Sequence, residues 1–178
     1  MFIKKNYLSI KKIKIKHGFF TRLNGLSKKN FNSLNCSISN GDDKKIVLKN
    51  RSIAMKNLHL EKKKLILIKQ THSSKVIRIN KNNLNKNLEA DGIITSLNDV
   101  VLGILTADCA PIFIYDNSNK FVCSLHSGWK GTLNNISKKA IMLFEKYDIN
   151  RNNLSAIIGP CLGFSNYEVE KDFEKQFI

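Results

Sequence analysis

Residues 121–146 have the sequence FVCSLHSGWKGTLNNISKKAIMLFEK, and two kinds of secondary structure are expected within them. The run from Phe121 to Leu125 is short and rich in large apolar residues, which is typical of a strand. From Thr132 to Lys146 the apolar residues recur every three or four positions and form one stripe, with lysines off it. This stripe consists of Leu133, Ile136, Ala140, Ile141 and Phe144. The stretch therefore predicts a strand followed by an amphipathic helix.

Apolar runs of strand length recur along the chain, bounded by Asn, Asp, Gly and Ser. Helical spacing of apolar residues predicts a helix over residues 44–58 and a terminal helix through Val169, Phe173 and Phe177. Strands that alternate with helices indicate a single α/β domain over residues 1–178. The further expected strands are Lys11–Lys16, with one face in water, and residues 65–68, 76–79, 93–95, 100–106, 112–115 and 156–158.

Hydropathy excludes several classes of protein. With 42% hydrophobic residues the chain can bury a core, and no run approaches the roughly 20 consecutive apolar residues of a membrane helix. The segment Met1–Lys16 alternates lysine with single apolar residues, so it lacks the apolar stretch of a signal peptide. We therefore expect a soluble, cytoplasmic protein with no membrane partner.

The net charge of +16 resides in the N-terminal part, because residues 1–75 contain nineteen Lys and Arg against three acidic residues. A nucleic-acid site would favour arginine over lysine and would interleave aromatic residues. Since four of the thirty basic residues are arginines, we interpret the lysines as solvated and do not expect a nucleic-acid partner. A non-catalytic binding module that docks through this basic part stays open as an alternative.

The cysteines also limit the function. They lie far apart and form no C-x-x-C pair, which excludes a zinc ribbon and a thioredoxin motif. We expect no disulfides among Cys36, Cys123 and Cys161, because the cytoplasm is reducing. The fourth cysteine, Cys109, matters if it acts as a thiolate.

Reactive residue types gather where three expected strands end. His72 follows the run 65–68, Asp108 and Cys109 follow the run 100–106, and His126 follows the run ending at Leu125. Open sheets place their sites at strand ends, so two imidazoles and a thiolate could converge. This ligand set suits zinc with a fourth position left to water. Taken singly, a buried cysteine or a hydrogen-bonded histidine is more often structural.

Seven motifs follow one another along the chain. They are HGFFTR at 17–22, SLN at 33–35, QTH at 70–72, ADG at 90–92, TADCAP at 106–111, HSGWKG at 126–131, and IGPC at 158–161 together with YEV at 167–169. In this order they resemble the motifs of the YfiH family. Members of that family are also labelled multicopper polyphenol oxidase (laccase), purine nucleoside phosphorylase and peptidoglycan editing factor.

The resemblance implies a compact layered α/β sandwich around a mixed β-sheet, with metal ligands that match His72, Cys109 and His126. It implies zinc-dependent phosphorolysis of adenosine, inosine, guanosine and methylthioadenosine, and deamination of adenosine. The expected partners are thus a purine nucleoside and phosphate. Copper is possible because blue-copper sites use two histidines and one cysteine. A multicopper cluster needs about ten histidines, whereas this chain has four.

Further roles follow from these motifs. Arg22 is the candidate phosphate ligand, with a helix N-terminus at Gly131–Thr132 as a second anion site. Asp108 either accepts a hydrogen bond from a ligand histidine or caps a turn. Trp129 either packs in the core or stacks on a base. A metal-free alternative uses Cys109 as a nucleophile with His126 as its base, in a hydrolase or amidase that edits peptidoglycan precursors.

The chain departs from the family pattern at several places, including Asn24 and Glu170, where the family more often has glycine. It has Lys130 where arginine is usual, and it ends where family members continue through an arginine-bearing stretch. We expect that a chain lacking this C-terminal portion leaves apolar surface uncovered, self-associates and has weak activity.

Overall fold

The structure is a computed structural model that describes residues 2–4, 6–11, 13–118 and 120–176. The chain divides into two units, which are described separately. The first comprises Met1–Leu65 and Asp99–Val101, and the second comprises Ile66–Asn98 and Leu102–Ile178. In the described residues no helix has the length and apolar character needed to cross a membrane.

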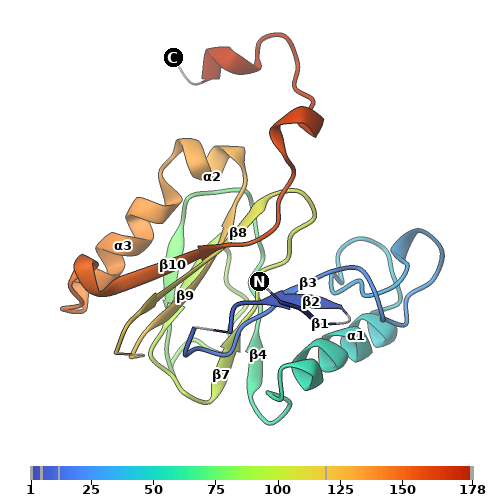
Figure 1. Ribbon diagram of the computed structural model, residues 1–178, viewed down its shortest axis with the longest axis horizontal. Coiled ribbons are helices and arrows are strands. Elements are labelled where there is room, and N and C mark those ends of the chain that lie inside the picture. The colour runs from blue at the N-terminus through green and yellow to red at the C-terminus, as the bar shows by residue number, and fades with distance from the viewer. Residues whose placement is uncertain (1, 5, 12, 119, 177–178) are drawn as a thin grey trace. The chain divides into compact units, whose positions relative to one another are not determined.

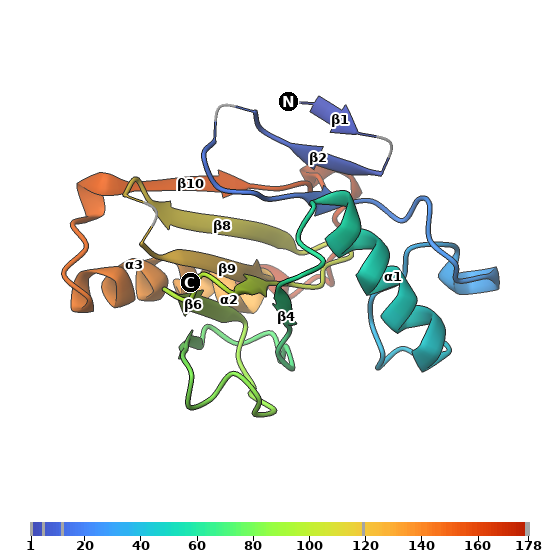
Figure 2. The ribbon, with the colours of Figure 1, turned by 90° about the horizontal axis from the view of Figure 1, so that it is seen from below.

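A five-stranded mixed sheet organises the second unit, as Figures 1 and 2 show. The strand order is β10-β8-β9-β6-β5. Neighbouring strands are antiparallel except β5 and β6, which run parallel. The strands are β5 (Val76–Ile79), β6 (Gly92–Thr95), β8 (Ala110–Asp116), β9 (Val122–Ser127) and β10 (Leu154–Ile158). The expected α/β class with a mixed sheet is confirmed.

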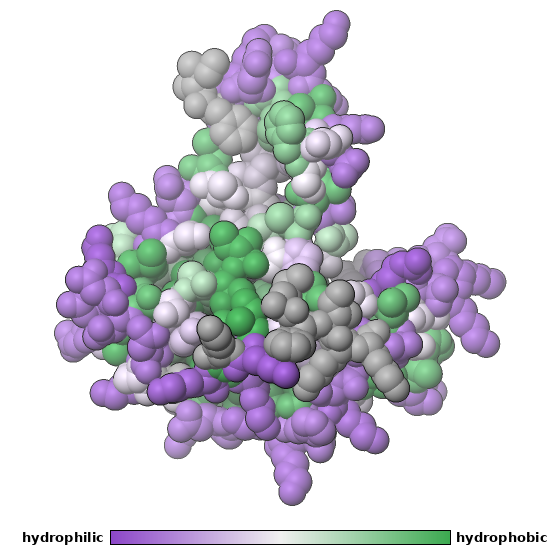
Figure 3. Space-filling view, viewed as in Figure 1, coloured by the Kyte–Doolittle hydropathy of each residue, from purple (hydrophilic) through white to green (hydrophobic). Residues whose placement is uncertain are grey.

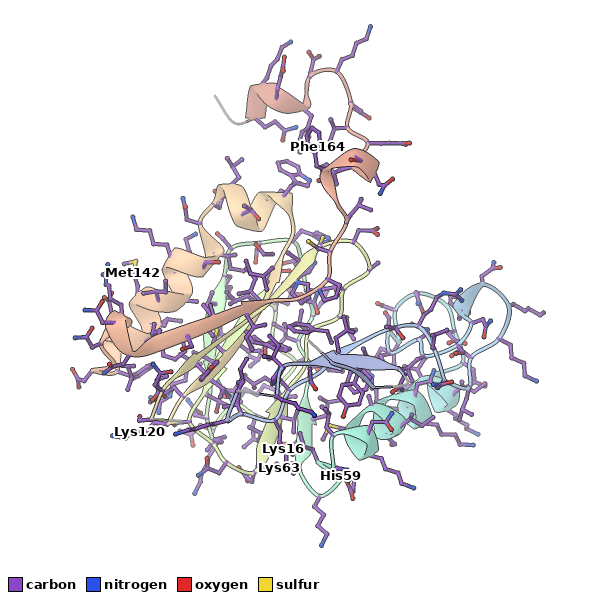
Figure 4. The ribbon with its side chains drawn as sticks, viewed as in Figure 1. Lys16, His59, Lys63, Lys120, Met142 and Phe164 are labelled. Atoms are coloured by element: carbon purple, nitrogen blue, oxygen red, sulfur yellow. The ribbon has the colours of Figure 1, made fainter. Side chains whose placement is uncertain are left out.

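Helix α3 (Ile136–Lys146) covers one face of this sheet and packs against β9, β5 and β6 (Figure 2). Its buried residues, Ile136, Ala140 and Phe144, are spaced by four and so lie on one stripe. They join Ile94, Ile114, Cys123 and Leu125 of the sheet in the core. On the opposite side of the helix, Met142 is 57% exposed and projects outward (Figure 4). The amphipathic pattern in the sequence therefore correctly identified the face that packs on the sheet.

The predicted helix over residues 132–146 is wrong at its start. The chain forms α2 (Trp129–Leu133), breaks, and begins α3 at Ile136. The break lies at Asn135, which adopts a left-handed backbone conformation (φ 57°) that asparagine tolerates well. Thr132 is inside α2, where its amide donates to the Gly128 carbonyl (2.9 Å). The expected anion site at a helix N-terminus at Gly131–Thr132 is therefore wrong.

The first unit contains a small antiparallel sheet, β1 (Phe2–Lys4), β2 (Tyr7–Ser9) and β3 (Phe19–Phe20), and the expected helix α1 (Lys44–Asn57). Asp43 caps α1 by accepting hydrogen bonds from the Lys45 and Ile46 amides. Two further strands, β4 (Lys64–Ile66) and β7 (Val100–Leu102), pair with each other.

Short 3-10 helices occur in both units. One lies at Lys29–Phe31 in the first unit, and three lie in the second, at Arg151–Asn153, Phe164–Asn166 and Phe173–Gln176.

The expected strand at Lys11–Lys16 is wrong for its described residues, which form turns and loop. The reason is the buried imidazole of His17. Its Nε2 accepts a hydrogen bond from the Ile10 amide (3.0 Å), and its Nδ1 lies 2.9 Å from the Ile15 carbonyl oxygen. The backbone around His17 is thereby folded into a loop, and the described residues of this segment are not assigned to any strand.

Two other predictions also need correction. The strand expected over residues 100–106 ends at Leu102, so Cys109 precedes β8 instead of ending a strand. The terminal helix is wrong, since Val169 lies in a loop and the 3-10 helix at Phe173–Gln176 is the regular element there; Phe177 lies outside the described residues. Beyond β10 the chain runs past the end of the sheet near α2 (Figure 1).

Candidate metal centre

Three chemically reactive side chains meet at one end of the sheet in the second unit. His72 lies in the loop before β5, Cys109 immediately before β8, and His126 near the end of β9. In the β8–β9 ladder Ala110 pairs with Ser127 and Pro111 with His126, so the start of β8 lies beside the end of β9. The antiparallel register thus brings Cys109 next to His126, although 17 residues separate them in the chain.

His72, Cys109 and His126 each offer one ligand atom, and these atoms all lie within 4.8 Å of one another. The two imidazole rings are nearly perpendicular, with centroids 4.7 Å apart. His126 is buried, at 3% exposure, Cys109 is half-buried and His72 is exposed. The cluster therefore has a buried side, formed by His126, and a side open to solvent at His72; we call the buried side its floor.

A fourth residue, Asp91, contacts the segments that carry His72 and His126 at this end of the sheet. It immediately precedes β6, where Gly92 pairs with Leu125 of β9, so Asp91 lies beside His126. Its carboxylate is fully buried. The Nδ1 of His126 lies 2.7 Å from Asp91 Oδ1, and the His126 amide donates to the Asp91 carbonyl (2.7 Å). Asp91 is therefore tied to His126 through both side chain and backbone.

The ionisation of Asp91 sets the tautomer of His126. Burial by itself raises the pKa of Asp91, but hydrogen bonds donated by His126, Ser73 and Thr71 outweigh it and hold that pKa below its ordinary value. An ionised carboxylate only accepts hydrogen bonds, so Nδ1 of His126 carries the proton. Nε2 of His126 is then the nitrogen available to a metal.

Gly128 leaves room for the cluster. A Cβ built on Gly128 would lie 3.1 Å from the sulfur of Cys109 and 3.2 Å from Cδ2 of His72. Both distances are shorter than ordinary van der Waals contact, so any side chain here would push the ligand side chains apart. Glycine at this position therefore permits the close approach of Cys109 and His72.

The surroundings of Cys109 disfavour a free thiolate. Burial is the largest cause raising the pKa of this thiol, and the nearby Asp108 and Asp91 carboxylates raise it further. A cation bound beside the sulfur would favour the deprotonated form. Two imidazole nitrogens and one thiolate are a donor set that fits zinc and also fits copper. These residues therefore suit either of the two metals.

The other residues singled out in the sequence have different positions. Arg22 is exposed in the first unit, where its Nη1 donates to the Asn32 carbonyl (3.2 Å). Asp108 is exposed beside Cys109, and its backbone carbonyl accepts from the Leu162 amide (2.9 Å). The carboxylate that contacts a candidate ligand histidine, His126, is that of Asp91. Trp129 is partly buried, and its ring packs edge-on against Phe173 (centroids 5.1 Å).

The sequence alone assigned no role to Asp91 or Gly128, although they belong to the motifs ADG and HSGWKG. The available signal for Asp91 was an acidic residue directly before Gly92–Thr95, a run that is buried throughout. An acidic residue next to such a run needs partners inside the fold. The signal for Gly128 was a glycine two residues after a candidate ligand, where close approach of backbone is common.

Comparisons with known proteins identify relatives of this chain. The model of a family described as multi-copper polyphenol oxidoreductase laccase matches residues 16–178. A purine nucleoside phosphorylase of Bacteroides thetaiotaomicron is 28% identical over 172 residues, covering 92% of this chain and 64% of the relative. Purine nucleoside phosphorylase YlmD of Bacillus subtilis is 31% identical over 162 residues, covering 86% of this chain and 58% of the relative.

A solved structure shares the fold. The crystal structure of the hypothetical protein YfiH of Bacillus licheniformis superposes with a TM-score of 0.83 at 27% identity, covering 89% of this chain and 63% of that one. This chain thus spans less than two thirds of the length of the relatives that it matches. Because the family match extends over nearly the whole sequence, the chain belongs to the multi-copper polyphenol oxidoreductase laccase family, as its resemblance to YfiH proteins indicated.

Proposed function

We propose that this chain forms the metal-binding part of a zinc-dependent enzyme that cleaves purine nucleosides by phosphorolysis. The observation that carries the proposal is the convergence of His72, Cys109 and His126, with ligand atoms within 4.8 Å of one another, in a chain similar to proteins named purine nucleoside phosphorylase. Adenosine, inosine, guanosine and methylthioadenosine are the proposed substrates, together with phosphate. Deamination of adenosine is a second reaction to be tested at the same site.

In phosphorolysis a phosphate oxygen bonds to C1′ of the ribose, the bond from C1′ to N9 of the purine breaks, and the base and ribose 1-phosphate leave. His72, Cys109 and His126 would hold the metal, with Nε2 of His126 turned to it by the Asp91 contact. Zinc in such a site supplies Lewis acidity and an open ligand position. The residues of this chain provide the buried floor and the open side through which a nucleoside could approach.

Arg22 is proposed to bind phosphate, because a guanidinium matches phosphate oxygens in a bidentate geometry. Trp129 is partly buried beside Gly128, and its ring packs edge-on against Phe173 of the segment after β10, which supports a packing role for Trp129 over stacking on a purine base.

The raised pKa of Cys109 argues against the metal-free alternative. A nucleophilic cysteine needs a lowered pKa, whereas burial and two neighbouring carboxylates here favour the neutral thiol. Copper fits the same donors, so metal identity has to be measured.

The test combines metal analysis with an activity assay on protein purified without added metal. We expect about one zinc per chain and phosphate-dependent release of purine base and ribose 1-phosphate. Cys109→Ser should lower both zinc content and turnover by about 100-fold or more, since it removes a ligand. Cys36→Ser is the matched control, because Cys36 is also half-buried but lies in the first unit. Full turnover by the Cys109→Ser variant, or base release without phosphate, would overturn the proposal.

A further inference from the structure

The carboxylate of Asp91 contacts both candidate ligand histidines through one oxygen. Oδ1 accepts from the ring nitrogen Nδ1 of His126 (2.7 Å) and from the backbone amide of His72 (3.0 Å). The second oxygen, Oδ2, accepts from the amide and hydroxyl of Ser73 (2.6 and 2.7 Å) and from the amide and hydroxyl of Thr71 (3.2 and 3.3 Å). One buried group thus joins two segments that are 54 residues apart at their histidines.

The segment that carries His72 has a backbone conformation that needs such support. His72 has a φ of 56°, in the left-handed region that residues with a Cβ adopt less readily than glycine. The three successive amides of Thr71, His72 and Ser73 all donate to the Asp91 carboxylate. A turn wrapped around an anion in this way directs its amides inward, and it fixes the point from which the His72 side chain leaves the backbone.

We propose that Asp91 is a positioning residue that orients both histidines, by holding the ring of His126 and the backbone turn of His72, so that the ligand atoms are arranged before a metal binds. This inference rests on the proposed metal site. The pairing with Asp91 leaves Nε2 of His126 as the nitrogen available to a metal, and the amide contacts hold the turn that carries His72, whose ligand atom lies within 4.8 Å of the other two. Loss of Asp91 therefore frees two of the three ligands at once.

Asp116 provides a matched comparison within the same unit. It is also buried, at 1% exposure, and its carboxylate also accepts from a hydroxyl and from backbone amides, those of Ser118 and Phe121. It lies at the last residue of β8, whereas Cys109 immediately precedes the first residue of that strand. A purely structural role for Asp91 predicts that Asp91→Asn and Asp116→Asn behave alike.

The experiment measures zinc affinity by chelator competition in wild type, Asp91→Asn and Asp116→Asn, with thermal unfolding of the metal-free proteins in parallel. We expect Asp91→Asn to weaken zinc binding by about 10- to 100-fold and to change the absorption spectrum of the cobalt-substituted protein. Asp116→Asn should lower the unfolding temperature but leave zinc affinity within about twofold of wild type. Equal zinc affinity in wild type and Asp91→Asn would overturn the proposal.

A second measurement uses the wild-type protein alone and so does not depend on whether a variant folds. In alkaline buffer, where an ordinary imidazole is neutral, nitrogen NMR of the metal-free wild type should show the proton of His126 on Nδ1. A proton on Nε2 would contradict the inference. These outcomes separate the positioning role of Asp91 from the proposed function. If zinc binds with the expected dependence on Asp91 but no nucleoside is cleaved, the proposed function fails and the positioning role stands. If the wild type binds no zinc, both fail.

Discussion

Gly128 shows how one missing side chain permits the cluster. The positions of Cys109 and His72 are set by β8 and by the turn around Asp91, and the backbone at Gly128 passes close to both side chains. A methyl group there would meet the sulfur at 3.1 Å and the imidazole at 3.2 Å. The imidazole of His72 is exposed and free to turn away, so the fold should tolerate the change better than the ligand geometry does.

We therefore predict that Gly128→Ala weakens zinc binding by about 10-fold or more while the unfolding temperature falls by only a few degrees. Isothermal titration with zinc and thermal unfolding would measure the two effects. Gly163→Ala is the matched control, because a Cβ at Gly163 would meet no atom within 4 Å. Unchanged zinc affinity in Gly128→Ala would contradict the prediction, because it would show that a Cβ at this position does not displace Cys109 or His72.

At the scale of elements, the turn between β8 and β9 depends on the Asp116 carboxylate. Its two oxygens accept from Ser118 and from the Phe121 amide (2.5 Å), so they hold the chain where it reverses after β8, at the end of that strand away from Cys109. Burial raises the pKa of Asp116, but these hydrogen bonds prevail and keep that pKa below its ordinary value. The ionised form is therefore the one that stabilises the folded state.

We predict a pH dependence of stability with a definite sign. Because the folded-state pKa of Asp116 is lowered, its contribution is complete above the unfolded-state pKa of about 3.9 and is lost as the pH falls through the folded-state pKa. Asp116→Asn should reduce the free energy of unfolding by about 1–3 kcal/mol at pH near 7, since an amide group mispairs with buried donors. Urea unfolding at several pH values should show this difference shrinking toward acid; a constant difference would contradict it.

At the scale of the molecule, apolar side chains are exposed on the segment after β10. Phe164 is 98% exposed, and Leu162 and Val169 nearby are also exposed. Figure 3 shows hydrophobic surface among the hydrophilic side chains of this segment, and Figure 4 shows the position of Phe164 within it. The outer edge of β10 has no strand partner among the described residues. Apolar surface and an open edge together favour association.

We predict that the 178-residue chain self-associates reversibly and that Phe164→Ser weakens the association by about 10-fold or more, because burial of a phenylalanine contributes roughly 1.5–3 kcal/mol. Met142→Ser on α3 is the control, since Met142 is exposed but lies away from this segment in the sequence and in Figure 4. Sedimentation velocity over a range of concentrations would measure both. A monomer at every concentration would exclude the prediction.

Local patterns were sufficient for most elements and for naming the three residues that converge in the candidate metal centre. The helix α1 and the strands β5, β6, β8, β9 and β10 were expected near their observed places, because runs of apolar residues and turn-forming residues act over a few positions. His72, Cys109 and His126 stood out by residue type and motif. The break before α3 and the loop around His17 were missed, since both depend on specific hydrogen bonds and backbone angles rather than on periodicity.

The amino-acid sequence alone named the three side chains that converge in the candidate metal centre, since imidazole and thiol groups and their motifs are visible in it. Only the tertiary structure shows that the carboxylate in contact with the candidate ligand His126 is that of Asp91, and that Gly128 leaves room for the cluster. The reason is that these roles arise from strand register: the ladder between β6 and β9 places Asp91 beside His126, 35 residues away. Such long-range pairing is set by burial of the whole sheet and leaves no local periodic signal.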